Sequence, residues 1–196
     1  MKLKEIATIR TGLVLSRKKA SPYDEKKRCY RQITLKSFSN TTTFQEEYFD
    51  EFFSVENIDK KYISKIGDIV IRLRKPIVAA YIDEKSAGLV IPSLMCVVRV
   101  KASGVNSAYL AHYLNSTPVK KMLEREIKGT TIPMIKTKDV ENIEVVLPSL
   151  EVQNKTVELM SLAAKEIELT KKLIRHKEQF SQAVLDKIVI NSMKDQ

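Results

Sequence analysis

The sequence has no long apolar run. The longest, residues 77–82, has six residues, whereas a helix that spans a membrane needs about 20. Charged side chains at Lys2, Lys4, Glu5 and Arg10 leave no room for the apolar core of a signal peptide. These absences argue against a membrane protein and against a secreted one. We therefore expect the chain to work in the cytoplasm.

Cysteine is scarce as well. Cys29 and Cys96 are the two cysteines of the chain, and they form no CxxC pair. A zinc site needs more ligands at closer spacing, and a reducing compartment disfavours a disulfide. We expect no metal site, and we expect both cysteines to be at least half-buried in the fold.

Glycine and proline are missing from the last part of the chain. All five glycines and all six prolines precede Ser149. Over residues 149–196, which are rich in Leu, Lys, Glu, Ala and Gln, this absence predicts one long helix. Ser149 is suited to the N-cap, and Glu151 in the first turn fits the helix dipole. The chain is therefore divided into a domain over residues 1–148 and a helix over residues 149–196.

The predicted helix carries two adjacent apolar stripes, one of them with the alternating steps of three and four residues that are typical of a coiled coil. One stripe could pack on the helix's own domain. A small domain, however, covers little of a helix that is about 60 Å long at 1.5 Å per residue. We therefore predict a partner helix. The residues expected at this dimerisation interface are Leu159, Leu162, Leu169, Leu173, Phe180, Ile167, Ile174 and Leu185.

The first 148 residues alternate β-like stretches with two helical ones. The expected strands are residues 30–35, 68–73, 77–82, 89–100 and 140–147. The expected helices are residues 107–115 and 119–128, the second ending at Gly129. The fold class that follows is α+β, with a mixed α/β domain and a long C-terminal helix.

Positive charge is in surplus and unevenly placed. Lys and Arg outnumber Asp and Glu by 34 to 24, which gives a net charge of +10 and suggests nucleic acid or an anionic membrane as partner. The largest basic cluster lies in residues 17–31, where Ser21, Pro22 and Tyr23 indicate a loop, and smaller clusters lie in residues 72–75 and 120–138.

Basic loops of this kind contact phosphates, and arginine also recognises guanine edges. We therefore predict DNA contacts from these loops. The candidate contact residues are Arg17, Lys18, Lys19, Lys26, Lys27, Arg28, Arg31, Arg72, Arg74, Lys75, Lys128, Thr130, Thr131 and Lys136.

Enzyme hypotheses have weaker support in the sequence. A DNA methyltransferase would need an Asn/Asp-Pro-Pro-aromatic motif, and the nearest match, residues 21–23, has one proline and no acid or amide before it. A Mg²⁺-dependent nuclease could use Asp68, Asp83 and Lys85, which follow the order of an acid and a later D-x-K. The same two acids could simply form turns at strand ends.

Two further alternatives concern histidine and the long helix. His112 and His176 form no triad with other residues, and we expect both to be structural. A coiled-coil adaptor that never binds DNA is also compatible with the helix. The basic stretch of residues 17–31 distinguishes the two hypotheses. In an adaptor, loss of its charges would leave partner binding intact, and there would be no DNA binding to lose.

Five stretches of the sequence occur in the order known from one protein family. They are LKEIATIRTG at residues 3–12, GDIVI at 67–71, YLAHYLNS at 109–116, GTTIP at 129–133 and LPSLEVQ at 147–153. Together they resemble the specificity subunits of type I restriction-modification systems. In the last stretch, serine and valine stand where the family usually has a second proline and a glutamate.

The resemblance implies a half-sized specificity subunit, because members usually carry two target-recognition domains and two long helical regions in one chain. A homodimer whose helices pair antiparallel would rebuild the whole. It would bind double-stranded DNA at a split palindrome, with half-sites up to about two turns apart at about 34 Å per turn.

In that family the specificity subunit does no chemistry and holds no cofactor. It directs a methyltransferase subunit and often a restriction subunit. The resemblance therefore implies that S-adenosylmethionine, ATP and Mg²⁺ enter only through these partner subunits.

Overall fold

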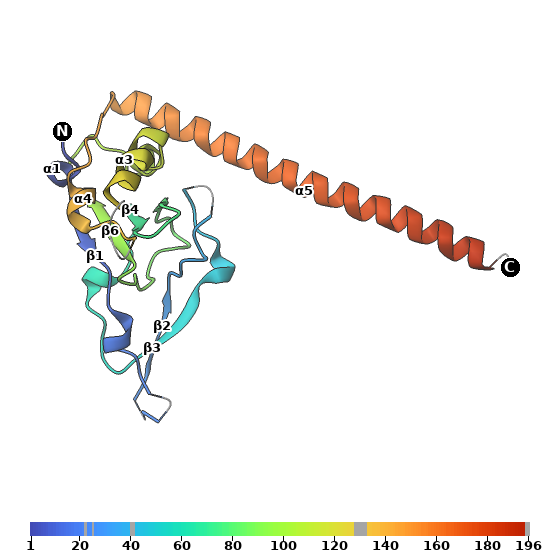
Figure 1. Cartoon of the computed structure of the whole chain (residues 1–196), viewed down its shortest axis with the longest axis horizontal. Helices are drawn as coiled ribbons and strands as arrows, with labels where there is room; N and C mark the ends of the chain where they lie inside the picture. Colours follow the sequence, from blue (N-terminus) through green and yellow to red (C-terminus); the bar gives the residue numbers. More distant parts are fainter. Residues whose placement is uncertain (22, 25, 40–41, 128–132, 195–196) are drawn as a thin grey trace. The chain divides into compact units, whose positions relative to one another are not determined.

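The computed structural model describes residues 1–21, 23–24, 26–39, 42–127 and 133–194 (Figure 1). The chain forms two units, Met1–Asn154 and Lys155–Gln196. The elements of the first unit are α1 (Leu3–Ile6), β1 (Ala7–Thr11), η1 (Leu15–Arg17), β2 (Arg28–Gln32), η2 (Glu46–Tyr48), β3 (Asp50–Ser54), η3 (Lys60–Tyr62), β4 (Asp68–Arg72), β5 (Ala79–Tyr81), β6 (Met95–Val100), α2 (Ser107–Leu114), α3 (Thr117–Ile127) and α4 (Thr137–Glu141). The long helix α5 (Leu150–Lys194) begins in the first unit and makes up the described part of the second.

A four-stranded antiparallel sheet forms the centre of the first unit. Its strand order is β1-β6-β4-β5, and β4 and β6 are the two inner strands. The inner strands are rich in Ile and Val, which suit a pleated sheet that is buried on both faces. Each fully buried side chain of this size contributes about 1.5–3 kcal/mol to stability.

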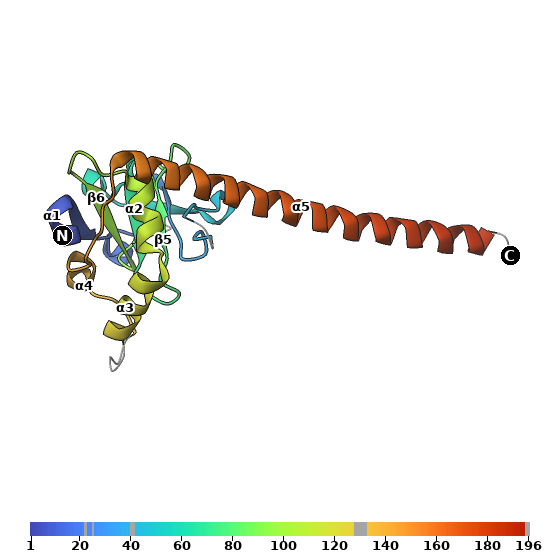
Figure 2. The ribbon, with the colours of Figure 1, turned by 90° about the horizontal axis from the view of Figure 1, so that it is seen from above.

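Different elements pack against the two faces of this sheet. Ile69, Ile71 and Val98 lie in an apolar cluster with the buried residues of α1, α2, α3 and α4. Val70 and Val97 point to the other face, where Met95 of β6 and loop residues, among them Ile33 directly after β2, complete a smaller cluster. Figure 2 shows α2 beside β5 and β6 on the helical side. Successive side chains of the inner strands thus point alternately to a layer of helices and to a layer of loops.

Gly12 lies at a close approach between two segments of backbone. Its N–H donates to the carbonyl of Met95 at 2.9 Å, and a Cβ at this position would lie 2.2 Å from the carbonyl oxygen of Pro92. Only glycine fits there without a shift of the backbone. This contact places the start of the basic segment, which follows directly after η1.

The beginning of α5 is anchored within the first unit by one buried amide. The Gln153 side chain is 1% exposed; its Nε2 donates to the carbonyls of Gly104 and Pro148 at 3.0 and 2.9 Å. Its Oε1 accepts from the backbone N–H of Asn106 at 2.9 Å. The hydroxyl of Ser149 accepts from the N–H of Val152 at 3.4 Å, which confirms the predicted N-cap.

The mixed α/β class, the long helix and most expected elements are confirmed, but three details were wrong. Residues 140–147 are no strand, because α4 ends at Glu141 and residues 143–145 pair only singly with residues 1–3. Within residues 89–100 the strand begins at Met95, after a turn at Pro92. Cys29 is exposed on β2, whereas Cys96 is buried as expected.

None of the helices in the described ranges combines the length and the hydrophobicity that a membrane-spanning segment requires.

Candidate nucleic-acid interface

The basic stretch of residues 17–31 is built onto a ribbon of two strands. β2 and β3 pair antiparallel, from Arg28 opposite Ser54 to Gln32 opposite Asp50 (Figure 1). On the other edge of β3, the N–H of Ala20 donates to the carbonyl of Phe53 at 2.8 Å. We call the described residues of 17–32 and 50–54 the basic ribbon. A two-stranded ribbon has the width that the major groove of DNA admits.

Most cations of the basic ribbon are exposed to solvent. The exposed ones are Arg17, Lys19, Lys26, Lys27, Arg28 and Arg31, whereas Lys18 is half-buried and paired with Glu56. The guanidinium of Arg31 lies 5.4 Å from the ring centroid of Phe49, and Phe49 in turn packs against Phe44. An aromatic ring therefore supports this arginine and limits its rotamers.

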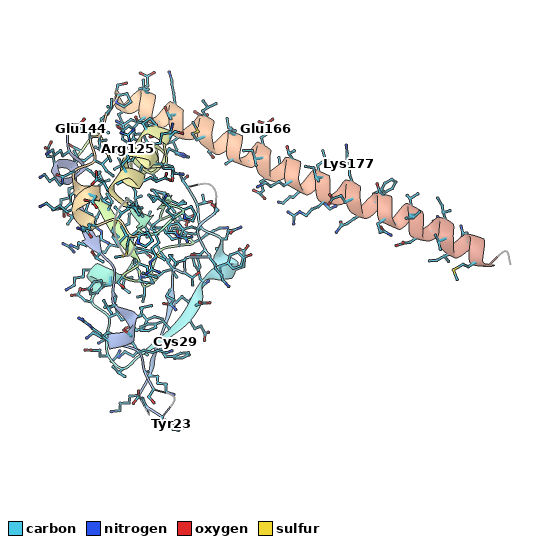
Figure 3. All side chains as sticks on the ribbon, viewed as in Figure 1. Tyr23, Cys29, Arg125, Glu144, Glu166 and Lys177 are labelled. Atoms are coloured by element: carbon cyan, nitrogen blue, oxygen red, sulfur yellow. The ribbon has the colours of Figure 1, made fainter. Side chains whose placement is uncertain are left out.

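Tyr23 is a feature of this ribbon that the sequence reasoning did not select. Its side chain is 93% exposed, and Figure 3 shows it at the far end of the ribbon from the sheet. An exposed aromatic ring between Lys19 and Lys26 can stack on a base or on a sugar. The signal in the sequence was an aromatic residue inside a run of cations.

The second and third basic clusters meet in the fold. Arg74 forms an antiparallel bridge with Met134, and the N–H of Ile135 donates to the carbonyl of Leu73 at 2.9 Å. This pairing places the exposed cations Arg74 and Lys75 in a segment that runs alongside the segment of the exposed Lys136. The other predicted contacts here, Lys128, Thr130 and Thr131, lie outside the described residues.

Arg72 differs from the other predicted contacts. Its two terminal nitrogens donate to the backbone carbonyls of Leu35 and Lys75, at 3.2 and 3.1 Å. Burial lowers the pKa of this guanidinium. Because the carbonyls already occupy these nitrogens, the geometry gives Arg72 a part in holding the loop that presents Arg74 and Lys75.

Comparison with known proteins shows the family of the chain. Residues 1–177 match the family model described as the type I restriction modification DNA specificity domain. The chain belongs to this family.

Two relatives of this specificity domain illustrate the match. The type I restriction enzyme MjaVIII specificity subunit of Methanocaldococcus jannaschii is 28% identical over 193 residues, which cover 93% of this chain and 42% of that protein. The crystal structure of the HsdS subunit from Thermoanaerobacter tengcongensis aligns with a TM-score of 0.64 at 16% identity, over 88% of this chain and 43% of that one. The chain thus spans less than half the length of these two relatives, and the structural likeness concerns the fold.

The acids considered for a nuclease have structural partners in this specificity domain. Asp68 is buried, and its two oxygens accept from Nε and a terminal nitrogen of Arg99 at 2.7 and 2.6 Å. The hydrogen bonds that Arg99 donates to Asp68 raise the pKa of Arg99. Asp83 accepts from the N–H and hydroxyl of Ser86, and Lys85 pairs with Glu46 at 3.3 Å. Across the described ranges, no three His, Cys, Asp or Glu residues are grouped as a metal site.

The two histidines of the specificity domain have different environments. His112 is half-buried on α2, where its Nε2 lies 3.4 Å from the hydroxyl oxygen of Thr42, and burial lowers its pKa. His176 is exposed on α5. The half-buried position of His112 fits the structural role expected from the sequence, and the role of His176 stays a prediction.

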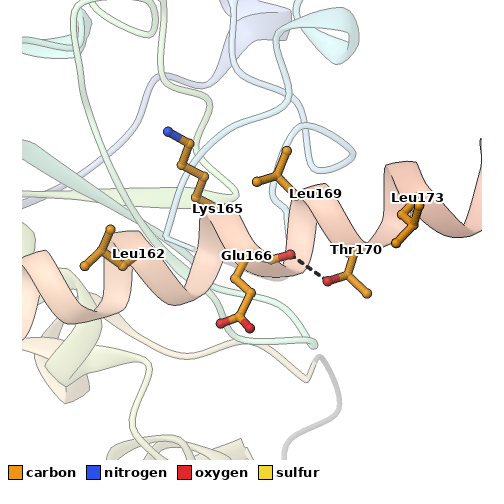
Figure 4. A pocket seen from close by; sticks show the side chains of 6 residues that line it. All are labelled: Leu162, Lys165, Glu166, Leu169, Thr170 and Leu173. Carbon is orange, nitrogen blue, oxygen red and sulfur yellow. Dashed lines mark hydrogen bonds between the residues drawn. The ribbon is translucent and has the colours of Figure 1, made fainter.

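The eight residues predicted for dimerisation all lie on α5. Each is between 51% and 70% exposed, so the helix presents a continuous apolar surface within the second unit. Figure 4 shows Leu162, Leu169 and Leu173 along α5, where they line a shallow hollow of about 490 Å³. A single helix of this length does not cover such a stripe by itself.

Proposed function

We propose that the first unit binds double-stranded DNA in a sequence-specific manner, with the basic ribbon in the major groove. The observation that carries this proposal is the group of six exposed cations in the basic ribbon, two of them on strand β2, in a chain of the DNA specificity domain family. Cations on such a ribbon contact phosphates, while side chains between them reach base edges. The DNA backbone would be contacted at a second point by Arg74, Lys75 and Lys136.

The salt dependence of DNA binding tests which cations contact phosphates. Each lost phosphate contact lowers the slope of log K against log salt by about 0.9 on B-form DNA. We expect Lys26→Ala and Arg28→Ala each to weaken binding to every sequence and to reduce this slope. The matched control is Arg175→Ala on α5, which removes one charge outside the first unit and should leave the slope unchanged. Equal slopes for all variants would contradict the placement of DNA on the ribbon.

We further propose that two copies of the chain pair through α5 in antiparallel orientation. The support is the exposed apolar surface of the helix. The residues of its two stripes are not part of the buried core of the first unit. Such a homodimer would hold two first units apart and would recognise a split palindrome with identical half-sites.

Single cysteines along the stripe test the orientation of this pair. In an antiparallel pair a residue meets its own copy only near the middle of the overlap, whereas in a parallel pair every stripe residue does. In a Cys29→Ser background, cysteines at positions 159, 162, 169, 173 and 180 should therefore give one maximum of disulfide cross-linking. Equal cross-linking at all five positions would contradict the antiparallel orientation.

We infer that this protein does no chemistry of its own and directs partner subunits. Membership of a DNA specificity domain family and the structural partners of Asp68, Asp83 and Lys85 support this inference. In this proposal a methyltransferase subunit supplies S-adenosylmethionine, and a restriction subunit uses ATP and Mg²⁺. Purified chain should therefore neither methylate nor cleave its target DNA when these cofactors are added.

A further inference from the structure

One apolar stripe of α5 contains two polar residues. This heptad stripe follows alternating steps of three and four residues, and its members, all exposed in the single chain, are Leu159, Leu162, Glu166, Leu169, Leu173, His176, Phe180 and Ala183. Glu166 lies in the wall of the hollow on α5, together with Leu162 and Leu169 (Figure 4). A carboxylate and an imidazole thus belong to a surface that is otherwise apolar.

Neither of these polar side chains has a partner in its own chain. Within the described ranges, the carboxylate of Glu166 and the imidazole of His176 take part in no hydrogen bond and no ion pair. The hydroxyl of Thr170 donates at 2.9 Å to the backbone carbonyl of Glu166 and does not involve its carboxylate. A polar group that enters an apolar interface is costly unless a polar group of the partner meets it. The partner of α5 should therefore supply one for each.

The order of residues in the heptad stripe is symmetric about position 171. The positions that mirror each other are 159 and 183, 162 and 180, 166 and 176, and 169 and 173. In an antiparallel pair of identical helices centred at position 171, each position meets its mirror position on the second copy. Apolar residues then meet apolar residues in every other layer of the stripe, and Glu166 meets His176. The stripe is therefore complementary to a second copy of itself.

Other ways of pairing the stripe with itself leave the polar residues mismatched. An antiparallel pair that slips by one heptad places Glu166 of one copy opposite either Leu169 or Ala183 of the other. A parallel pair in register places two copies of Glu166 opposite each other, where like charges repel. Of these arrangements, only the antiparallel pair centred at position 171 brings an acid to an imidazole.

We propose that two copies of the chain pair in one register, in which the Glu166 carboxylate of each copy accepts a hydrogen bond from His176 of the other. This proposal rests on the antiparallel pairing proposed above and adds to it the residues that determine its register. An imidazole N–H donates to a carboxylate whether the ring is neutral or charged. A polar contact inside an apolar seam fixes the register at a cost in stability. A slip of one heptad would change the separation of the two helix N-termini by about 10 Å.

Disulfide cross-linking between two different cysteine variants tests the register. In a Cys29→Ser background, Leu162→Cys should cross-link with Phe180→Cys, and Leu169→Cys should cross-link with Leu173→Cys. The matched controls exchange the partners of the same four variants. Position 162 with 173, and position 169 with 180, lie one heptad out of register, about 10 Å apart along the axis, and should not cross-link. A tag on one chain of each mixture separates the mixed dimers by mass.

An exchange of charge tests whether the two polar side chains meet. His176→Glu places a second carboxylate opposite Glu166 and should raise the dissociation constant of the dimer by about tenfold or more, measured by light scattering. The further substitution Glu166→Lys in the same chain should bring the constant back to near the wild-type value. The matched control is Ser161→Glu, which adds the same charge at an exposed position outside the heptad stripe and should leave the constant unchanged.

Preferential cross-linking of the exchanged partners would overturn this register and leave the antiparallel pairing standing. A double variant that dimerises more weakly than His176→Glu alone would overturn the contact between Glu166 and His176. A monomeric wild-type chain, or equal cross-linking of every stripe position with its own copy, would overturn both this proposal and the antiparallel pairing on which it rests, so the failures are distinguishable.

Discussion

At the scale of single residues, Asp68 and Arg99 form an ion pair in which the carboxylate is buried and the guanidinium is partly exposed. Asp68 is 1% exposed, and its carboxylate accepts two hydrogen bonds from Arg99 and one from the backbone N–H of Lys65. Removal of one member of a buried pair leaves the other charge without compensation. We expect Asp68→Ala to lower the free energy of unfolding by about 3 kcal/mol, measured by urea denaturation.

The control for this prediction is a pair on the surface. Glu46 and Lys85 lie 3.3 Å apart with their side chains about half or more exposed, so water already screens them. Glu46→Ala should leave the midpoint of urea unfolding unchanged. If Asp68→Ala behaved like Glu46→Ala, the Asp68 carboxylate would not have the structural role described above, and the nuclease hypothesis would regain its principal acid.

The two cysteines should differ sharply in reactivity. Burial raises the pKa of the Cys96 thiol to about 12, whereas Cys29 is exposed on β2. Because the thiolate is the reactive form, only about one Cys96 in ten thousand would be ionised at pH 8. We expect an aromatic disulfide reagent to modify one thiol per native chain rapidly and the second only after unfolding in guanidinium.

Cys29→Ser supplies the control for this assay. The variant should lose the rapid phase completely and keep the thiol that reacts after unfolding. Two rapid thiols in the native wild-type chain would show that Cys96 is accessible, contrary to its place in the sheet.

At the scale of elements, the apolar stripe of α5 decides whether two chains associate. Leu173 is 54% exposed in the single chain, and a buried leucine of this kind stabilises an interface by about 1.5–3 kcal/mol. Because the pair contains two copies, Leu173→Asp should raise the dissociation constant of the dimer by about a hundredfold or more. Light scattering across a range of protein concentrations measures this constant.

Gln179→Asp introduces the same acid on the polar face of α5. Gln179 lies one heptad after Lys172, which pairs with Glu168 at 2.6 Å on that face. This variant should dimerise like wild type. A monomeric wild-type chain at high concentration, or equal dissociation constants for the two variants, would contradict pairing through the stripe.

Elements differ in how well their sequences predict them. The long helix follows from the absence of glycine and proline after Pro148, and β4 follows from a short run of Ile and Val. β3 was missed because Asp50 and Glu51 are poor strand formers; their pairing with β2 supplies the stability that local propensity lacks. The anchoring of α5 by Gln153 was missed too, because two of its three hydrogen bonds join residues distant in the chain.

At the scale of the whole molecule, the surplus of positive charge was visible in the sequence but its arrangement was not. The largest cluster lies on one ribbon because residues 18–20 pair with β3. The two smaller clusters meet because Arg74 pairs with Met134. Both pairings are non-local, and spacing along the chain does not predict them. Tyr23, by contrast, stands inside a run of cations in the sequence itself.

The central claim is that this chain distinguishes one DNA sequence from others. The most direct measurement is the ratio of its affinities for the selected duplex and for a scrambled duplex of the same length and composition, at about 0.15 M salt. The account predicts a ratio of about a thousand or more, as is typical of specific DNA-binding proteins. A ratio near one would show that the basic ribbon binds DNA only through its charge, and it would contradict the account.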